Sequence, residues 1–325
     1  MAQFLSEYGL FLLELLTVLI LVGLAAVLIA AAARRGAGSD GLTIEHLNED
    51  LERKADLMRR VLLGKDRFRK QARARARQRK RERREKSADR RRVFVLDFKG
   101  DIRASAAASL REEVSAILAV AEDSDEVVLR LENAGGAVHE HGFAASQLLR
   151  LKNRRLRLTI AVDKVAASGG YLMACIADHL IAAPFAIIGS IGVVAQLPNF
   201  HRLLENKGID FEQITAGRYK RTLTLFGENT EEGRQKLREE LDEVHALFKR
   251  QIAEQRPAVD LESVATGEHW YGTRALELAL IDAIGTSEDY LLAAADDADL
   301  YKVTYKRKRS LQERFVGGAE GLLGL

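Results

Sequence analysis

Val165-Ala166-Ala167-Ser168-Gly169-Gly170-Tyr171 sets a single serine between a strand-like run and a helix-like run. The apolar run at 158–162 before it is typical of a short buried strand, and the Ala-rich run at 171–177 after it favours a buried helix. Ser168 therefore lies in a strand-to-helix turn, and the two glycines after it let the backbone turn sharply. Two interpretations stay open. Ser168 either caps the helix or exposes its hydroxyl as a nucleophile.

Strand-like and helix-like segments alternate on both sides of this turn. Strands are predicted at 93–98, 126–131, 158–162 and 179–183, and helices at 105–121, 143–151 and 170–177. This alternation predicts an α/β fold in which βα units form a mostly parallel sheet covered by helices. In such sheets, ligands bind at the carboxyl ends of the strands.

Three glycine-rich loops are expected at those strand ends. They are Asn133-Ala134-Gly135-Gly136, the Ser168 turn, and Gly189-Ser190-Ile191-Gly192-Val193, which is placed after the strand near Ile181. A phosphate cradle is not favoured, because no Gly-x-x-x-x-Gly-Lys-Ser/Thr tract occurs and no Gly-x-Gly-x-x-Gly opens a helix. The better use is an oxyanion hole, in which two backbone N–H groups meet the charge that develops on an attacked carbonyl.

A nucleophilic serine needs a base, and the chain offers seven histidines and one notable lysine. The histidines are predicted to lie at the surface or at the rim of a site, since none has the surroundings of a Ser-His-Asp order. His139-Glu140-His141 lacks a third ligand and is weak evidence for a metal. Lys220 follows the turn residue Gly217 and stands beside Tyr219. A lysine acts as a base only when burial lowers its pKa, and by itself Lys220 fits an ordinary surface lysine as well.

The N-terminal part of the chain predicts a membrane anchor at 1–35. Residues 15–33 are nineteen consecutive residues without a charge, enough to cross a hydrocarbon core of about 30 Å as one helix. No Lys or Arg precedes this run, so a retained span is a better interpretation than a cleaved signal peptide.

A basic juxtamembrane arm is predicted at 36–92. Twenty Lys or Arg stand against five Asp or Glu between Arg53 and Arg92, although the whole chain has a formal charge of only +3. Such a run is a solvated helix or coil that attracts anionic lipid headgroups. Specific nucleic-acid binding is not expected, because Phe68 is the only aromatic residue in the run. The positive-inside rule does not decide on which side of the membrane the following domain lies, since only Arg34 and Arg35 are close to the span.

Two further features concern packing. Cys175 is the single cysteine, which excludes an intramolecular disulfide, and its apolar setting predicts a core thiol. The segment 230–256 predicts a long charged helix whose apolar stripe suits packing against the body or a neighbouring copy.

Several motifs, in order and spacing, resemble one family. Ser-Gly-Gly-Tyr at 168–171, Gly-Ser-Ile-Gly-Val at 189–193 and Gly-x-Tyr-Lys at 217–220 are similar to motifs of the signal peptide peptidase A (protease IV) family. The tracts at 220–233 and 265–272, with the N-terminal anchor and the basic arm, resemble the SohB branch of that family. The resemblance covers approximately residues 90–315.

The resemblance implies a ClpP/crotonase-type α/β fold for a peptidase domain at 93–315, followed by a C-terminal tail at 316–325. It implies a membrane-anchored serine endopeptidase that cuts extended peptides, unfolded segments or signal-peptide remnants. The expected partners are the peptide or unfolded substrate, the lipid bilayer and further copies of the chain. The expected location is the inner (cytoplasmic) membrane, with the domain on the periplasmic side.

Carried over to this chain, the resemblance implies a serine/lysine dyad. Ser168 would be the nucleophile and Lys220 the general base, with Ser190 orienting the lysine. The amides of Gly136 and Gly169 would form the oxyanion hole. A neutral lysine takes the serine proton, an acyl-enzyme forms, and the lysinium returns the proton to the leaving amine. No metal, nucleotide or other cofactor is expected.

The chain departs from the family at the first oxyanion loop. The family usually has Ser-Pro-Gly-Gly where this chain has Asn133-Ala134-Gly135-Gly136. Both glycines are kept, but losing the fixed φ of proline leaves the loop less preset. Two alternatives therefore stay beside the peptidase. One is crotonase-like acyl-CoA chemistry, which would use carboxylates as acid and base, and the other is a membrane scaffold of the same fold with weak or no catalysis.

Overall fold

The computed structural model describes residues 16–17, 41–86 and 90–307. The chain divides into two compact units, of which one spans 43–304 and the other combines 1–42 with 305–325. Apart from Leu16 and Thr17, the predicted span at 15–33 lies outside the described residues, as does the tail at 316–325. Within the described ranges, the structure contains no helix that is both long and apolar enough to span a membrane.

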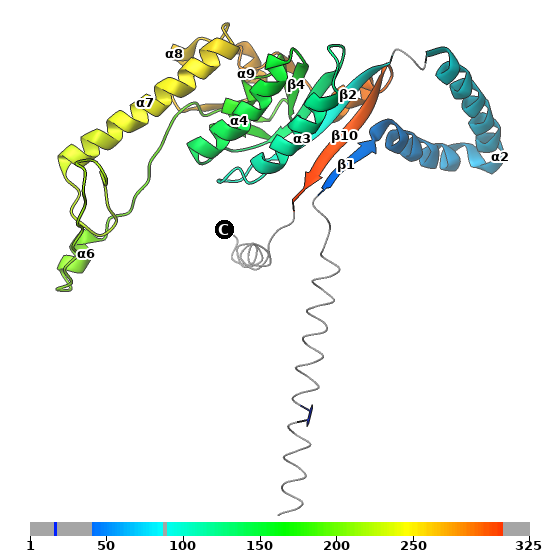
Figure 1. Ribbon diagram of the computed structural model, residues 1–325. Coiled ribbons are helices and arrows are strands. Elements are labelled where there is room, and N and C mark those ends of the chain that lie inside the picture. Colours follow the sequence, from blue (N-terminus) through cyan, green and yellow to red (C-terminus); the bar gives the residue numbers. More distant parts are fainter. Residues whose placement is uncertain (1–15, 18–40, 87–89, 308–325) are drawn as a thin grey trace, which may run out of the picture. The chain divides into compact units, whose positions relative to one another are not determined.

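In the described parts of the chain, ten strands form two sheets (Figure 1). They are β1 Gly41–His46, β2 Arg91–Lys99, β3 Glu126–Glu132, β4 Arg157–Val162, β5 Val165–Ala167, β6 His179–Ala182, β7 Ile187–Gly189, β8 His269–Tyr271, β9 Ala283–Ile284 and β10 Ala298–Lys306. The larger sheet has the order β1-β10-β2-β3-β4-β6-β9, and its strands from β10 to β9 pair in parallel. The smaller sheet has the order β5-β7-β8, with β5 parallel and β8 antiparallel to β7.

The helices alternate with the strands of the larger sheet, as the sequence predicts. They are α2 Leu47–Lys86, α3 Ala107–Val120, α4 Val138–Asn153, α5 Gly169–Ala174, α6 His201–Glu205, α7 Glu231–Gln255, α8 Leu261–Val264, α9 Gly272–Glu277 and α10 Ser287–Ala294. This mixed α/β architecture with a parallel-rich sheet fits the ClpP-type fold that the resemblance implies.

Alternate side chains of the central strands enter two different cores. Phe94, Leu96 and Phe98 of β2 join a large cluster to which α3, α4 and α5 contribute, whereas Val93 and Val95 join a smaller one with α10. All five side chains are at most 7% exposed. Neighbouring residues of a strand point to opposite faces, so helices on both faces require an unbroken apolar run.

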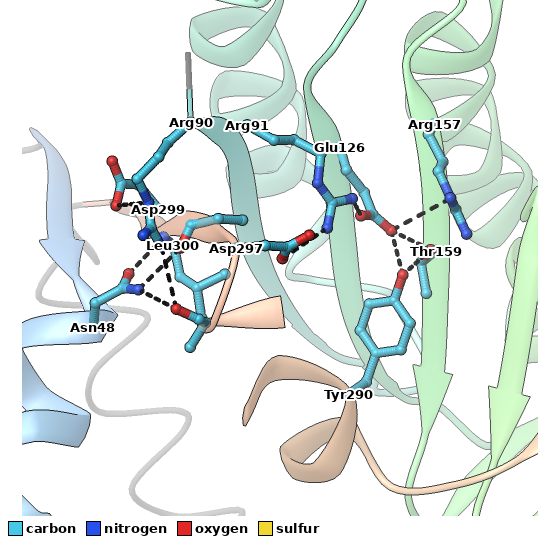
Figure 2. Close-up of polar contacts among 12 residues, drawn as sticks. Asn48, Arg90, Arg91, Glu126, Arg157, Thr159, Tyr290, Asp297, Asp299 and Leu300 are labelled. Atoms are coloured by element: carbon cyan, nitrogen blue, oxygen red, sulfur yellow. Dashed lines mark hydrogen bonds and ion pairs between the residues drawn. The ribbon is translucent and has the colours of Figure 1, made fainter. Parts of the chain in front are cut away.

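A buried carboxylate joins the amino-terminal ends of the central strands. Glu126, the first residue of β3, is 1% exposed and accepts hydrogen bonds from the hydroxyls of Thr159 and Tyr290 at 2.6 Å each, as well as from Arg91 (Figure 2). The guanidinium of Arg157 lies 3.7 Å away. Burial and the hydrogen bond to Glu126 raise the pKa of Tyr290. These donors compensate for the water that the carboxylate loses on burial.

Helix α2 lies within the predicted basic arm at 36–92 and is folded back on itself. Near its start, Asn48 accepts the backbone N–H of Leu300 at 2.7 Å (Figure 2). Gly64, with φ of 72°, interrupts the helix, and beyond it Arg75 donates to Asp56 at 3.5 Å. The first part of the arm is therefore a helical hairpin hinged at a glycine that tolerates positive φ.

Candidate active site

Ser168 lies in the predicted strand-to-helix turn, between β5 and α5. Its backbone has φ of 51° and ψ of −120°, a conformation that costs a non-glycine residue about 1–3 kcal/mol. Its N–H donates to the carbonyl of Gly189 at 2.8 Å, and its own carbonyl accepts from Leu172 at 3.0 Å. The side chain makes no capping hydrogen bond to α5. The helix-cap interpretation is therefore wrong, and the backbone of the turn is fixed while the hydroxyl is left for another partner.

The smaller sheet positions both Ser168 and Ser190. The expectation that the glycine loop at 189–193 follows the strand near Ile181 is wrong, because the short strand β7 lies between them. In the parallel pair of β5 and β7, Ala167 is opposite Gly189, so the serines that follow these residues emerge at the same edge. Strands of three residues are too short to show a period-2 pattern, which is why the sequence did not reveal this sheet.

Strand β8 supports the loop of Ser190. The N–H of Ser190 donates to the carbonyl of Glu268 at 2.6 Å. Trp270 packs so closely on Gly189 that a Cβ there would lie 2.9 Å from the indole ring. The tract at 265–272, which contributes to the family resemblance, thus supplies backbone and packing beside Ser190.

Gly135 and Gly136 bring the first loop against the Ser168 turn. A Cβ on Gly135 would lie 2.7 Å from the Cβ of Ser168, and a Cβ on Gly136 would lie 2.3 Å from the carbonyl oxygen of Ile102. Both glycines also have positive φ, 95° and 155°. A larger residue at either position would have to displace its neighbour, so the first loop can lie against the Ser168 turn only with glycine at 135 and against Ile102 only with glycine at 136.

Asn133 fixes this loop in place of the Ser-Pro pair. Its side chain is 1% exposed, and its Oδ1 accepts the N–H of Gly135 at 2.9 Å and lies 3.2 Å from Nε2 of His141. Its backbone carbonyl accepts from the N–H of Ala167 at 3.0 Å. The segment is thereby tied both to the glycine that follows it and to the strand that leads to Ser168.

His141 is fully buried, so the prediction that the histidines lie at the surface or rim is wrong for this residue. Its ring packs on Gly169, where a Cβ would lie 2.5 Å from the ring atom Cγ. The reason is tertiary, because the first turn of α4 faces α5 and encloses a side chain whose sequence neighbours are polar. Across the described residues, no group of three His, Cys, Asp or Glu side chains could hold a metal ion.

A cavity of about 410 Å³ opens beside these loops. Gly136, Ser168 and Gly169 contribute to its wall, and the rest of the wall is largely apolar. The apolar side chains are Val138, Leu149, Leu172, Val193, Val244, Leu247 and Phe248. Neither Gly136 nor Gly169 donates its backbone N–H to another residue in the parts of the chain that the structure describes. Unpaired amides beside a serine hydroxyl are the groups that an oxyanion hole needs.

Lys220 is not brought to Ser168 within the single chain. It is exposed, and its neighbour Tyr219 lies under the ammonium of Lys236 at 5.5 Å, near the start of α7. Phe248, which lines the Ser168 cavity, comes twelve residues after Lys236 on the same helix. Twelve residues of α-helix span about 18 Å, so the segment of Lys220 and the cavity lie along different parts of α7.

Helix α5 is anchored by its buried side chains. The hydroxyl of Tyr171 donates to the carbonyl of Leu280 at 2.8 Å, and burial raises the pKa of this phenol. Cys175 is buried at the end of the helix, which confirms the predicted core thiol. Burial raises the pKa of its thiol to about 12. The helix that follows Ser168 is therefore held in the core by the buried side chains of Tyr171 and Cys175.

Known proteins match almost the whole chain. The family model described as "Peptidase family S49 N-terminal" matches residues 3–148, and "Peptidase family S49" matches residues 150–301. A "Probable protease SohB" of Haemophilus influenzae is 48% identical over 328 residues, which cover 97% of this chain and 93% of the relative. A "Probable protease SohB" of Buchnera aphidicola subsp. Acyrthosiphon pisum is 55% identical over 228 residues, 70% of this chain and 68% of the relative.

A more distant relative is also named as a protease. The "Putative protease slr0021" of Synechocystis sp. is 29% identical over 242 residues, which cover 72% of this chain and 86% of the relative. The matches confirm the resemblance that the motifs indicate. The chain belongs to peptidase family S49, as a SohB-like protease.

Proposed function

We propose that this protease is a serine endopeptidase that cleaves extended peptides, unfolded segments or signal-peptide remnants through an acyl-enzyme on Ser168. One observation carries the proposal. The strained turn of Ser168 opens on an apolar cavity beside the unpaired amides of Gly136 and Gly169. A peptide carbonyl placed there would have its carbon at the hydroxyl and its oxygen at the two amides, which is the arrangement for acyl transfer.

Lys220 is the proposed general base. Its neutral amine takes the proton of Ser168 as the serine oxygen attacks the carbonyl carbon, and the resulting ammonium protonates the leaving amine. The same amine then deprotonates the water that hydrolyses the ester. Ser190, which emerges beside Ser168, is proposed to hydrogen-bond the lysine amine and hold it toward the nucleophile. Peptidase membership favours this reaction over acyl-CoA chemistry.

We infer that the lysine reaches the serine from a neighbouring copy of the chain. The segment 193–230, which carries Lys220, exposes apolar side chains: Val194 is 77%, Phe200 42% and Ile214 94% exposed. Exposed apolar surface of this kind indicates an interaction surface. A second copy that covers the segment would bring its own cavity to the lysine, and repetition of this head-to-tail contact closes a ring. Mixing of Ser168→Ala with Lys220→Ala, each expected to be inactive alone, tests this step.

We propose that residues 15–33 anchor the chain in the inner (cytoplasmic) membrane, with the basic helical hairpin near anionic headgroups. The periplasmic side is proposed for the protease domain from the family resemblance alone. A C-terminal fusion to alkaline phosphatase, which is active only outside the cytoplasm, tests the side. Activity is expected for the periplasmic side. An inactive phosphatase fusion, together with fluorescence of a cytoplasmic reporter fused at the same point, would show instead that the domain lies in the cytoplasm.

The test of the reaction uses the full chain purified in detergent, a peptide library and a fluorophosphonate. The wild type should cleave peptides and be labelled at Ser168, whereas Ser168→Ala should do neither and should unfold at the same temperature. Ser146→Ala is the matched control, because Ser146 also lines the cavity but donates its hydroxyl to the carbonyl of Phe143 at 2.7 Å. Cleavage by Ser168→Ala would overturn the proposal. A wild-type chain that is neither labelled nor able to cleave peptides would favour the alternative of a membrane scaffold with weak or no catalysis.

A further inference from the structure

His141 contacts both loops that carry the proposed amide donors. Its Nε2 lies 3.2 Å from Oδ1 of Asn133, and that oxygen accepts the N–H of Gly135, the residue before Gly136, at 2.9 Å. Its ring packs directly on Gly169, where a Cβ would lie 2.5 Å from Cγ. One imidazole thus contacts the second loop itself and the first loop through a single side-chain amide.

The geometry also fixes which atom of Asn133 faces the loop. The backbone N–H of Gly135 is a donor, so the side-chain atom that it meets must be the oxygen. The amide nitrogen then donates to the sulfur of Met173 at 3.4 Å. His141 meets an acceptor at both ring nitrogens, Oδ1 of Asn133 at Nε2 and the carbonyl of Ala137 at Nδ1, 3.0 Å away, so Nε2 hydrogen-bonds Asn133 when it carries the ring proton. Asn133 is 1% exposed and His141 fully buried, so neither side chain is available to a substrate.

The glycine loop needs such support. Gly135 and Gly136 have positive φ and no side chain, so nothing in their own structure prevents other conformations. Ala134 precedes them with an exposed side chain and does not fix φ as a proline would. An oxyanion donor accelerates a reaction by about 10²–10³-fold only when it points at the oxyanion. A misplacement of 1 Å costs about hundredfold.

We propose that Asn133 and His141 are positioning residues that hold the amides of Gly136 and Gly169 toward one common point. His141 holds Asn133 and Gly169, and Asn133 holds Gly135. The inference rests on the proposed function, because it assigns these two amides to the oxyanion hole. Its consequence is kinetic. Loosening the pair displaces groups that bind the transition state, so kcat falls while KM stays unchanged.

Two pairs of variants test the proposal, with the unfolding temperature measured for each. Asn133→Leu and His141→Leu remove the hydrogen bond between them, and kcat should fall roughly ten- to hundredfold at unchanged KM. Asn133→Asp keeps the acceptor and His141→Gln keeps a donor, so both should retain most of the activity. If one leucine variant does not fold, the other leucine variant carries the test. The conservative variants then show whether an acceptor at 133 and a donor at 141 are enough to keep kcat.

A peptide aldehyde supplies a readout that a structural role alone would not move. The Ser168 oxygen adds to its carbonyl carbon, the serine proton passes to the base, and the carbonyl oxygen becomes an oxyanion in the hole. The dissociation constant of the aldehyde should rise by the same factor by which kcat/KM falls. The affinity for the corresponding peptide alcohol, which forms no oxyanion, should stay constant.

A rescue variant completes the test. The backbone N–H of Ala134 donates to no other described residue, so Ala134→Pro removes no hydrogen bond that the structure shows and fixes one φ of the loop. In the His141→Leu background it should recover activity several-fold, and in the wild type it should change little. Leucine variants with wild-type kcat, or losses confined to KM, would overturn this inference while Ser168 still reacts with the fluorophosphonate. A wild type that neither reacts nor cleaves would overturn the proposed function as well.

Discussion

The two ends of strand β3 carry buried polar side chains of contrasting kinds. At the amino-terminal end, the carboxylate of Glu126 is surrounded by side-chain donors from other strands and from α10 (Figure 2). Just beyond the carboxyl-terminal end, the neutral amide of Asn133 meets a glycine N–H and an imidazole. The first arrangement joins rigid elements to one another, and the second shapes a loop beside a cavity.

The contrast extends along both edges of the sheet. Carboxylates that receive hydrogen bonds follow the amino-terminal edge: Asp125 with Arg92 at 2.7 Å, Asp178 with the N–H of Leu158 at 2.9 Å and Asp282 with Arg256 at 2.6 Å. At the other edge, amides and the Ser168 hydroxyl line the cavity, and the buried side chains of Asn133 and His141 lie behind them. Ion pairs also occur at the carboxyl-terminal edge, where Lys164 donates to Glu132 at 3.0 Å, but the loops beside the cavity are held by amides and close glycine packing. Substitutions of Glu126 and of these loops should therefore affect different measurements.

The largest effect is expected from Gly135→Ala at the carboxyl-terminal end. The added Cβ would lie 2.7 Å from the Cβ of Ser168, and φ of 95° would strain it as well. We expect kcat/KM for a peptide substrate to fall about a thousandfold, since both the nucleophile and the neighbouring amide move. Gly64→Ala is the control, because Gly64 also has positive φ but no atom within 4 Å of the added Cβ. Similar kcat/KM values for the two variants would show that close packing of Gly135 on Ser168 is not needed for catalysis.

Glu126→Ala should have the converse effect at the amino-terminal end. Thr159 and Tyr290 would lose a shared acceptor, and we expect the free energy of unfolding to fall by about 2–3 kcal/mol. The kcat of the folded fraction should be unchanged. Glu288→Ala, which removes a carboxylate that is 72% exposed and 3.5 Å from Arg130, should cost less than about 0.5 kcal/mol in denaturant unfolding. A large loss of kcat in Glu126→Ala would show that the two ends are coupled.

Acid should weaken the amino-terminal edge through Asp282. Burial alone would raise the pKa of this carboxyl, but hydrogen bonds from Arg256 and from the N–H of Leu180 lower it below its ordinary value of 3.8. The pair therefore stabilises the fold fully above that value, and the contribution is lost as the pH falls through the folded pKa. Asp282→Asn should lower the free energy of unfolding by about 1 kcal/mol at pH 7, discounted because the carboxylate is partly exposed. A difference from wild type that stays constant down to pH 2 would contradict this.

The smallest effect is expected at Cys175, which ends the helix that Ser168 begins. With a pKa of about 12, its thiol is ionised at pH 8 to about one part in ten thousand. Iodoacetamide should therefore leave the folded protein unmodified and fully active. Mass spectrometry of the native and the urea-unfolded chain measures this directly. Rapid modification of the native chain would show that α5 opens.

The strands of the larger sheet were predictable because burial on both faces requires an almost unbroken run of apolar residues. Val93 to Phe98 is apolar almost throughout, and the helices between the strands keep their 3.6-residue pattern. The turn at Ser168 was predicted to follow the strand at 158–162 directly, whereas the short strand β5 lies between them. The smaller sheet could not be predicted, because β5, β7 and β8 have only three residues each.

The contacts around Asn133 and His141 depend on tertiary structure. Eight residues separate the two, and only the start of α4 beside α5 brings the imidazole under Gly169. Glu140 next to His141 made a surface position the natural expectation. The position of Lys220 relative to Ser168 was also beyond sequence patterns, since the segment of Lys220 lies near the start of α7 and the Ser168 cavity near its later part.

Ser168 and Lys220 are proposed to form one active site across two copies of the chain, and mixing two inactive variants tests this proposal. Ser168→Ala and Lys220→Ala are purified separately in detergent, mixed in equal amounts and allowed to exchange subunits, with exchange followed by fluorescence transfer between labelled copies. Each variant alone should be inactive. The mixture should reach about a quarter of wild-type activity, because one head-to-tail contact in four combines an intact serine with an intact lysine. Exchange without any gain in peptide cleavage, or full activity of Lys220→Ala alone, would contradict the account.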